Sequence, residues 1–168
     1  CSNDCAKVRM ADFGIIGMTE PQYDPNRCVA CEQCIKYCKK RSVDALSLVN
    51  GKIVRDTKKC IGCGVCITYC PTRAWTRSKE HYFRLVILGR TGKRNPRLAE
   101  DFIKWCDEES ILKIAANTYA YIEEYIDPEA VENKEHIGYI VDRTGFEKFK
   151  EYIFRDVSLS EKAEVAQE

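Results

Sequence analysis

Two cysteine runs with identical spacing constrain the fold of this chain more than any other feature. They read CVACEQCIKYC (28–38) and CIGCGVCITYC (60–70), and both follow C-x2-C-x2-C-x3-C with a period of 32 residues. Three cysteines placed two residues apart rarely reach disulfide geometry without strain. The same run is used for paired [4Fe-4S] clusters. The spacing therefore favours cluster ligands over a disulfide framework or zinc.

The composition indicates the class of protein and the cellular compartment in which such clusters would occur. The chain has 168 residues, of which 45% are hydrophobic and 32% charged, which is typical of a globular protein of one or two domains. We expect no membrane span, no signal peptide and no nucleic-acid partner. Eleven cysteines in cluster-type spacing indicate a reducing, low-oxygen cytoplasm. Because the first residue is Cys1 rather than Met, the sequence is expected to be a piece of a longer chain.

The segment between the runs predicts a β-hairpin. In DALSLVNGKIVRD (44–56) apolar residues alternate around Asn50-Gly51, a strong signal for a two-residue turn. Each cysteine run should lead into a short helix. This order of elements over residues 23–79 resembles the bacterial two-cluster ferredoxins. In that family the fourth cysteine of each run ligates the other cluster.

The ferredoxin resemblance implies two crossed ligand sets. The first is Cys28, Cys31, Cys34 and Cys70, and the second is Cys60, Cys63, Cys66 and Cys38. We expect Gly62 and Gly64 to let the backbone approach the sulfurs. Ile35, Val65 and Ile67 are expected to exclude water. One departure is that Lys39, Lys40 and Arg41 follow Cys38, where the pattern has proline; they form either a solvated basic edge or a docking patch that raises a cluster potential.

The flanks predict strands and helices unlike a ferredoxin. Residues 11–18 and 82–89 read as buried strands, and Asn95-Pro96 as the start of a helix. We expect Ser110 to cap a second helix and the capping-box spacing of 144–147 to start a third. The tail from residue 158 should fray. In the expected first helix, one face carries Leu98, Phe102, Trp105 and Cys106.

These elements predict an α+β fold in which the ferredoxin-like module is inserted into another domain. The expected boundaries are 1–22 for the start of the host domain, 23–79 for the module, 80–157 for the rest of the host, and 158–168 for a flexible tail. The simpler alternative is a linear order, with the module first and a helical domain second. Insertion requires the host segments on either side of the module to lie close together.

The flanks resemble the sirohaem sulfite and nitrite reductase family. The segments CSNDCAKVRMADFGIIG (1–17) and YFRLVILGRTGKRNPRLAEDF (82–102) carry the resemblance. In that family a C-x5-C pair and a later C-x3-C pair hold one cluster, and the last cysteine bridges to sirohaem iron. Cys1 and Cys5 match the second pair, with Cys5 in the bridging, catalytic position. A ferredoxin at this point in the chain resembles the dissimilatory and anaerobic sulfite reductases, the sirohaem-binding subunit of the latter most closely.

The resemblance implies six-electron reduction of sulfite to sulfide, with electrons passing from the ferredoxin clusters to a sirohaem–[4Fe-4S] centre. Two [4Fe-4S] clusters are expected in these 168 residues, while sirohaem and a third cluster belong to the full-length protein, because Cys1 and Cys5 supply only half of its ligands. Arg90, Lys93 and Arg94 are candidates for cofactor contact, or form a basic loop. Implied partners are other reductase subunits and a ferredoxin- or NADH-linked donor.

Other interpretations stay open at this point. The chain is alternatively a non-catalytic electron-transfer module of another oxidoreductase, a nitrite reductase, or a paralogue that binds the tetrapyrrole for another purpose. Outside the cysteine runs, we expect Cys106 to be a core residue and His81 and His136 to be exposed or satisfied. Trp75 is expected to pack on the module or at its join with the host.

Overall fold

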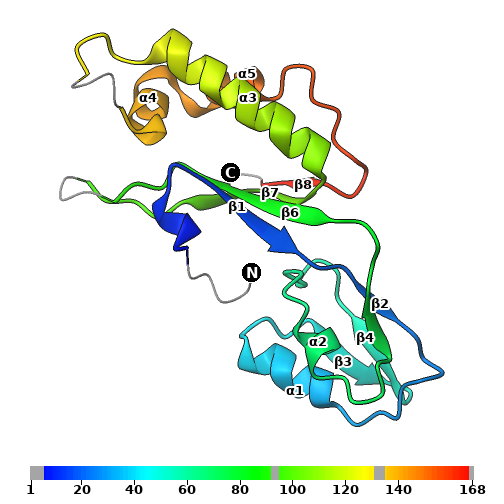
Figure 1. The fold of residues 1–168 in the computed structure, drawn as a ribbon. Helices are drawn as coiled ribbons and strands as arrows, with labels where there is room; N and C mark the ends of the chain where they lie inside the picture. Colours follow the sequence, from blue (N-terminus) through cyan, green and yellow to red (C-terminus); the bar gives the residue numbers. More distant parts are fainter. Residues whose placement is uncertain (1–5, 92–94, 131–134, 167–168) are drawn as a thin grey trace. The chain divides into compact units, whose positions relative to one another are not determined.

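A computed structural model describes residues 6–91, 95–130 and 135–166, which divide into two compact units (Figure 1). Met18–His81 form one, here called the cysteine unit. Residues 6–17 and 82–166 form the other, here called the sheet unit. Both units combine helices with antiparallel strand pairs, so the predicted α+β class is confirmed.

The sheet unit contains a four-stranded sheet in the order β1-β6-β7-β8. Its strands are β1 (Phe13–Met18), β6 (Tyr82–Ile87), β7 (Glu100–Cys106) and β8 (Glu164–Val165). β7 is antiparallel to both β6 and β8. β1 and β6 are neighbours although the whole cysteine unit separates them in sequence, which is the arrangement that an inserted module requires.

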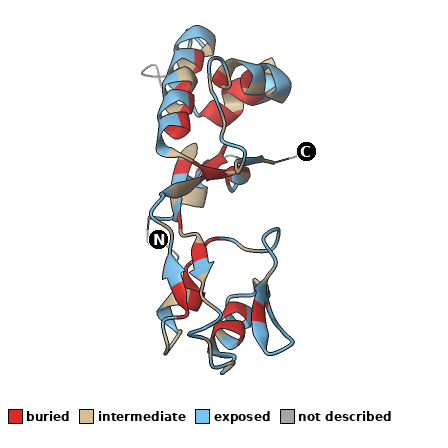
Figure 2. Ribbon diagram, turned by 90° about the vertical axis from the view of Figure 1, so that its right-hand side faces the viewer, coloured by how far each residue is buried: buried red, intermediate tan, exposed pale blue. Residues whose placement is uncertain are grey.

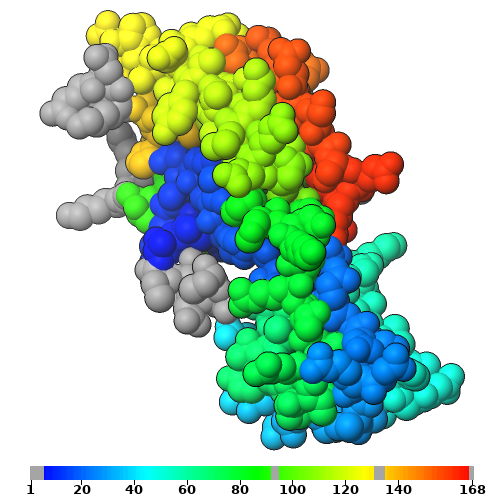
Figure 3. Space-filling view, turned by 45° about the vertical axis from the view of Figure 1, so that its right-hand side comes forward, coloured from blue at the N-terminus to red at the C-terminus, as the bar shows by residue number. Residues whose placement is uncertain are grey.

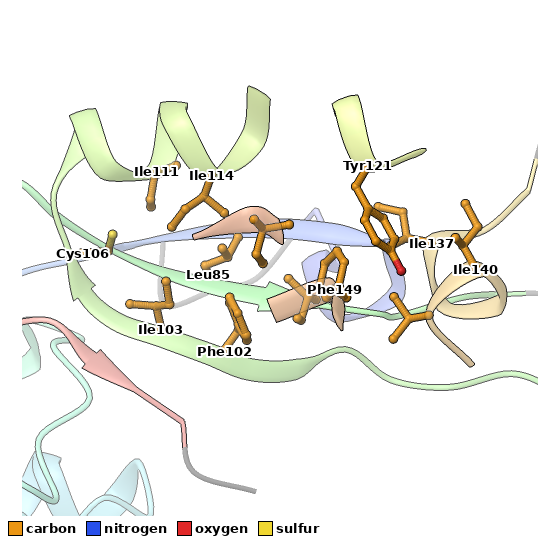
Figure 4. Packing of buried hydrophobic residues seen from close by; sticks show 13 residues of the cluster. Leu85, Phe102, Ile103, Cys106, Ile111, Ile114, Tyr121, Ile137, Ile140 and Phe149 are labelled. Atoms are coloured by element: carbon orange, nitrogen blue, oxygen red, sulfur yellow. The ribbon is translucent and has the colours of Figure 1, made fainter. Parts of the chain in front are cut away.

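Helices cover one face of this sheet (Figure 1). They are α3 (Glu108–Tyr125), α4 (Ile137–Thr144) and α5 (Phe146–Ile153), and a 3-10 turn, η1 (Val8–Met10), precedes β1. Figure 4 shows side chains of β6 and β7, among them Leu85 and Ile103, gathered with those of the helices, among them Ile114 and Phe149. All four are at most 1% exposed, and burial of such apolar surface is the main stabilising contribution to the unit. Cys106, fully buried, is a core residue as predicted.

β7 replaces the helix that was expected after Asn95-Pro96. The spacing of Phe102, Trp105 and Cys106 suits one helical face, but β7 is a central strand that pairs with neighbours on both sides. Phe102, Ile103, Trp105 and Cys106 are all buried in this strand, so its apolar residues do not alternate with polar ones. A register shift against β6 and the positive φ of Trp105 (57°) mark a bulge, which lets the adjacent Trp105 and Cys106 both be buried.

Two helix starts also differ from the prediction. Asp107, not Ser110, caps α3: its carboxylate accepts a hydrogen bond from the Ser110 backbone N–H at 2.8 Å. Thr144 does not cap α5. It is the last residue of α4, a helix that was not predicted from the sequence, and its hydroxyl donates a hydrogen bond to the Ile140 carbonyl. Gly145 at the junction has φ 96° and so takes the cap position without a side chain.

The C-terminal segment was expected to fray but packs on the sheet unit up to residue 166. Glu164 and Val165 form β8 against β7, and the Ala166 N–H donates to the Phe102 carbonyl at 2.9 Å. Val157 and Leu159 pack on the core, which explains why a mostly polar segment is held. In Figure 3 this orange to red segment lies against the yellow-green start of α3.

The cysteine unit is built from short elements around its own core, separate from that of the sheet unit (Figure 2). β2 (Pro21–Tyr23) pairs antiparallel with β5 (Trp75–Arg77), so the first and last strands of the unit are neighbours. β3 (Leu46–Val49) and β4 (Lys52–Arg55) form the predicted hairpin. Its turn residues, Asn50 and Gly51, have φ values of 50° and 74°, as a type I′ turn requires. The two short helices are α1 (Gln33–Lys40) and α2 (Val65–Thr68).

The α3 cap allows a stability prediction. Asp107→Ala removes the acceptor for the Ser110 N–H and should lower the free energy of unfolding of the sheet unit by about 1 kcal/mol. Urea denaturation followed by far-UV circular dichroism measures this change. The matched control is Glu109→Ala, an exposed acidic residue in the same turn that does not cap the helix. Equal effects of both substitutions would contradict the cap assignment.

Candidate functional site: two groups of thiols

Four thiols from both cysteine runs meet at one cavity. Cys28, Cys31 and Cys34 come from the loop before α1 and its first turn, and Cys70 follows α2. The rest of the lining is largely apolar or aromatic and includes Ile53, Pro71 and Trp75. The structure thus brings the last cysteine of the second run to the first three of the first run.

The other four thiols form a second group. Cys66 and Cys38 are buried and Cys60 and Cys63 half-buried. Burial raises the pKa of the Cys66 thiol to about 12, and the neighbouring Cys60 and Cys63 add to the rise. Burial also raises the pKa of Cys38, although the Ala45 N–H lowers it, and Cys63 and Cys60 contribute as close neighbours. Cys38 from the first run therefore lies with the three leading cysteines of the second.

Backbone amides point at sulfur atoms in both groups. The Ala74 N–H donates to Cys70 Sγ at 3.2 Å, the Ala45 N–H to Cys38 Sγ at 3.3 Å and the Ala30 N–H to Cys28 Sγ at 3.5 Å. Burial acts to raise the pKa of Cys70, but hydrogen bonds from the Trp75 and Ala74 amides and the Thr72 side chain outweigh it and leave that pKa lowered. Such donors stabilise thiolates, the form that binds metal.

The arrangement does not suit a single metal ion. Among the described residues, no three His, Cys, Asp or Glu side chains are grouped as ligands of one ion. Every cysteine in the described ranges is a free thiol. A cluster needs its four thiolates spread over four irons, whereas a tetrahedral zinc site draws them to about 2.3 Å from one ion. Four thiols around a shared cavity therefore fit a cluster better than zinc.

The turns that position these thiols use positive φ angles. Gly62 and Gly64, in the second run, have φ values of 64° and 69°. In the first run the matching bends fall on Ala30 (φ 52°) and Glu32 (φ 57°), which are non-glycine residues in a conformation they seldom adopt. Ile35 is buried in the same core as the cysteines, Ile67 is half-buried there, and Val65 is also buried.

Tyr37 and Tyr69 connect the two runs. They occupy the same repeat position, directly before the fourth cysteine of each run, and their rings stack at 3.5 Å between centroids with 10° between planes. The stack holds α1 and the residue after α2 together, next to the two cysteines that change groups. The repeat sequence alone did not indicate this contact.

Trp75 packs on the module, one of its two expected placements, but its pairing with Tyr23 was not predicted from the sequence. Trp75, which is only 3% exposed, packs in the cysteine unit with its ring 4.6 Å from that of Tyr23. Burial raises the pKa of Cys34, but the Trp75 side chain lowers it, which places the indole beside this sulfur. The sequence signal that could have indicated this contact is a difference between the repeats: Val43 stands at the position that matches Trp75.

The other candidate residues are placed as follows. Arg90 is 8% exposed and donates to Asp142 at 3.1 Å and to the Asn95 carbonyl at 2.6 Å, so it ties the residues after β6 to α4 within the sheet unit. Lys39 and Lys40 are exposed on α1. Four predicted site residues, Cys1, Cys5, Lys93 and Arg94, lie outside the described residues.

The two histidines have no ligand role in the described ranges. His81 is exposed, and His136 Nδ1 lies 2.7 Å from Asp12 Oδ2. Across these ranges, none of the helices has the length and apolar character to cross a lipid bilayer.

Comparison with protein families separates the reductase interpretations from that of an isolated electron-transfer module. The family model described as "Nitrite and sulphite reductase 4Fe-4S domain" matches residues 1–162. The chain belongs to this family. Membership supports iron–sulfur cofactors for the thiols described above, and it places the chain among the oxidoreductases rather than the isolated ferredoxins.

Curated relatives agree with this family. A subunit of the anaerobic sulfite reductase of Salmonella typhimurium is 41% identical over 167 residues, which is 99% of this chain and 49% of the relative. The corresponding subunit from Salmonella typhi gives the same values. The chain thus spans about half the length of the curated relatives it matches. Among solved structures, a dissimilatory sulfite reductase I has the same fold, with a TM-score of 0.62 at 19% identity, over 91% of this chain and 40% of that one.

Proposed function

We propose that this chain is the electron-transferring part of a sulfite reductase subunit. Its cysteine unit relays electrons to a sirohaem–[4Fe-4S] centre, where sulfite is reduced to sulfide in a six-electron reaction. The observation that carries the proposal is the exchange of Cys38 and Cys70 between the two runs, because this is the ligand pattern of two-cluster ferredoxins. Family membership supports the reductase to which the electrons are delivered.

The two thiol groups fit [4Fe-4S] clusters. In each, four thiols from both runs converge, and backbone N–H groups donate to the sulfurs. We assign Cys28, Cys31, Cys34 and Cys70 to one cluster and Cys60, Cys63, Cys66 and Cys38 to the other. When bound, such clusters accept and release one electron at a time. The protein keeps water away with Ile35, Val65 and Ile53.

The remaining assignments rest on the resemblance of the flanks to the family. Cys1 and Cys5 would supply two ligands of a third cluster, with Cys5 next to sirohaem. Of the basic candidates, Arg90 is held by Asp142, which favours a structural role within the sheet unit over direct cofactor contact. The relatives are named as subunits, which supports a complex with other subunits. The proposed cytoplasmic location rests on the free thiols, which a reducing compartment maintains.

The test is iron and sulfide analysis of the anaerobically reconstituted chain, together with electron paramagnetic resonance of the reduced protein. We expect about eight irons per chain, as two cubane clusters require. About four irons, or metal removable as zinc, would contradict the two-cluster assignment. Addition of the reduced chain to its reductase partners should then support sulfite consumption with sulfide as the product.

Nitrite is a second candidate substrate, because the family description covers both reductases. The same assay, run with sulfite and with nitrite at equal concentration, distinguishes them. Faster turnover of sulfite is expected from the 41% identity to anaerobic sulfite reductase subunits. Turnover of nitrite alone would overturn the assignment of substrate and leave the electron-transfer role in place.

A further inference from the structure

The indole N–H of Trp75 has an unusual environment. Trp75 lines the cavity of Cys28, Cys31, Cys34 and Cys70, and the side chain is 3% exposed. Within the described ranges, its Nε1 is buried and makes no hydrogen bond of normal distance and angle, although the indole is near enough to the Cys34 sulfur to lower the pKa of that thiol as a donor. A buried donor that is left unpaired costs about 1–3 kcal/mol, so this orientation calls for an acceptor at the cavity.

Tyr23 and the β2–β5 pairing fix the position of this indole. Tyr23 and Trp75 are directly opposite in the antiparallel register, and their rings are 4.6 Å apart. The Tyr23 hydroxyl accepts the Ile53 N–H at 3.1 Å and lies beside the Cys28 sulfur. Trp75 lies beside Cys34. Two polar aromatic groups held by the same strand pair therefore face sulfurs of one cavity.

The repeat has no equivalent donor at the second thiol group. Trp75 follows Cys70 by five residues, and the residue five positions after Cys38 is Val43. Val43 packs against the core of the cysteine unit and has no side-chain donor. Each group does have a main-chain donor to its exchanged cysteine, Ala74 to Cys70 and Ala45 to Cys38, although these two donors lie at different repeat positions. At this repeat position the first site therefore has an indole donor and the second site has none.

We propose that the Trp75 indole N–H donates a hydrogen bond to a sulfur of the cluster held by Cys28, Cys31, Cys34 and Cys70, and raises the reduction potential of that cluster alone. One-electron reduction adds a negative charge that is shared by the cluster sulfurs. A donor aimed at these sulfurs therefore stabilises the reduced form more than the oxidised form. Trp75 acts by tuning the cluster and is not a ligand. The inference rests on the proposed function, because it requires both clusters.

The first experiment compares Trp75→Phe with Trp105→Phe in the reconstituted protein. Phenylalanine keeps an aromatic ring against Tyr23 but removes the N–H. We expect one of the two potentials, measured by redox titration with electron paramagnetic resonance, to fall. The expected change is up to roughly tenfold in the reduced-to-oxidised ratio, about 59 mV for one electron, and the other potential should stay constant. Trp105, a buried tryptophan of the sheet unit, is the matched control and should change neither.

A second measurement keeps the indole in place. The chain has two tryptophans, so Trp105→Phe leaves Trp75 as the single site for a 15N-indole label. Pulsed electron paramagnetic resonance of the reduced protein should show 15N hyperfine coupling to one cluster. This experiment decides the question even if Trp75→Phe fails to assemble clusters.

The outcomes separate the two proposals. An unchanged pair of potentials in Trp75→Phe, with iron still near eight per chain and no 15N coupling, would overturn the role of Trp75 and leave the two-cluster function standing. If the unsubstituted protein instead binds far fewer than about eight irons per chain, the proposed function itself is overturned.

Discussion

Cys70→Ala is expected to remove one cluster completely and to lower iron from about eight to about four per chain. Cys70 lies at the cavity lined by Cys28, Cys31 and Cys34, so its loss leaves three thiolates where a cubane needs four. It also breaks a covalent tie between the two cysteine runs, and metal binding is coupled to folding in small metal-dependent units. Part of the cysteine unit should therefore become sensitive to proteolysis. Iron analysis and limited proteolysis measure the two effects.

Other cysteine substitutions provide the control for Cys70→Ala and a test of the ligand exchange. Cys106→Ala truncates a buried cysteine in the core of the sheet unit and should leave the iron content unchanged. The exchange of ligands is tested by combining Trp75→Phe with Cys70→Ala or with Cys38→Ala. The effect of Trp75 on potential should survive loss of Cys38 and vanish with Cys70. The reverse pattern would contradict the assignment of Cys70 to the first cavity.

Phe149→Ala should destabilise the sheet unit by about 3–5 kcal/mol. The Phe149 side chain, 1% exposed on α5, meets Tyr121 at 5.0 Å between ring centroids and packs in the core shared by the helices and the sheet (Figure 4). Its truncation removes apolar contacts and leaves a cavity that the surrounding side chains fill only partly. Urea denaturation followed by Trp105 fluorescence in a Trp75→Phe background reports on this unit, while visible absorbance reports on the clusters.

An exposed aromatic residue provides the comparison. Tyr119 on α3 is 72% exposed, and Tyr119→Ala should change the free energy of unfolding by no more than about 0.5 kcal/mol. A similar loss in both variants would show that the helices do not bury the face carrying Phe149. In Phe149→Ala the cluster absorbance should persist, because the cysteine unit has its own core.

Local features of the cysteine unit were predictable from sequence because their causes are local. The Asn50-Gly51 turn forms since both residues accept positive φ, and alternation around it sets the hairpin. The spacing of the thiols indicated cluster chemistry before any fold was known. The ligand exchange, in contrast, came from resemblance to ferredoxins. The Trp75 N–H at the cavity was missed, since a tryptophan in a short apolar segment gives no sign of where its nitrogen points.

The errors occurred in the sheet unit, where long-range contacts decide local conformation. Asn95-Pro96 and the spacing of Phe102, Trp105 and Cys106 favour a helix by every local rule, yet β7 forms because pairing with β6 and β8 satisfies its backbone on both edges. β8 itself lies in a segment whose composition indicated fraying. Asp107 competed with Ser110 for the α3 cap, and sequence alone did not separate two good capping residues three positions apart.

By itself the sequence determined the iron–sulfur chemistry of the cysteine runs and the hairpin between them, because ligand spacing and turn residues act over a few positions. Only the tertiary structure decided which thiols share a cavity, that residues 13–18 and 82–87 are neighbouring strands, and that an indole N–H faces one cavity and not the other. These arrangements depend on burial and pairing between segments far apart in the chain. The free energy of such contacts exists only once the whole fold has formed.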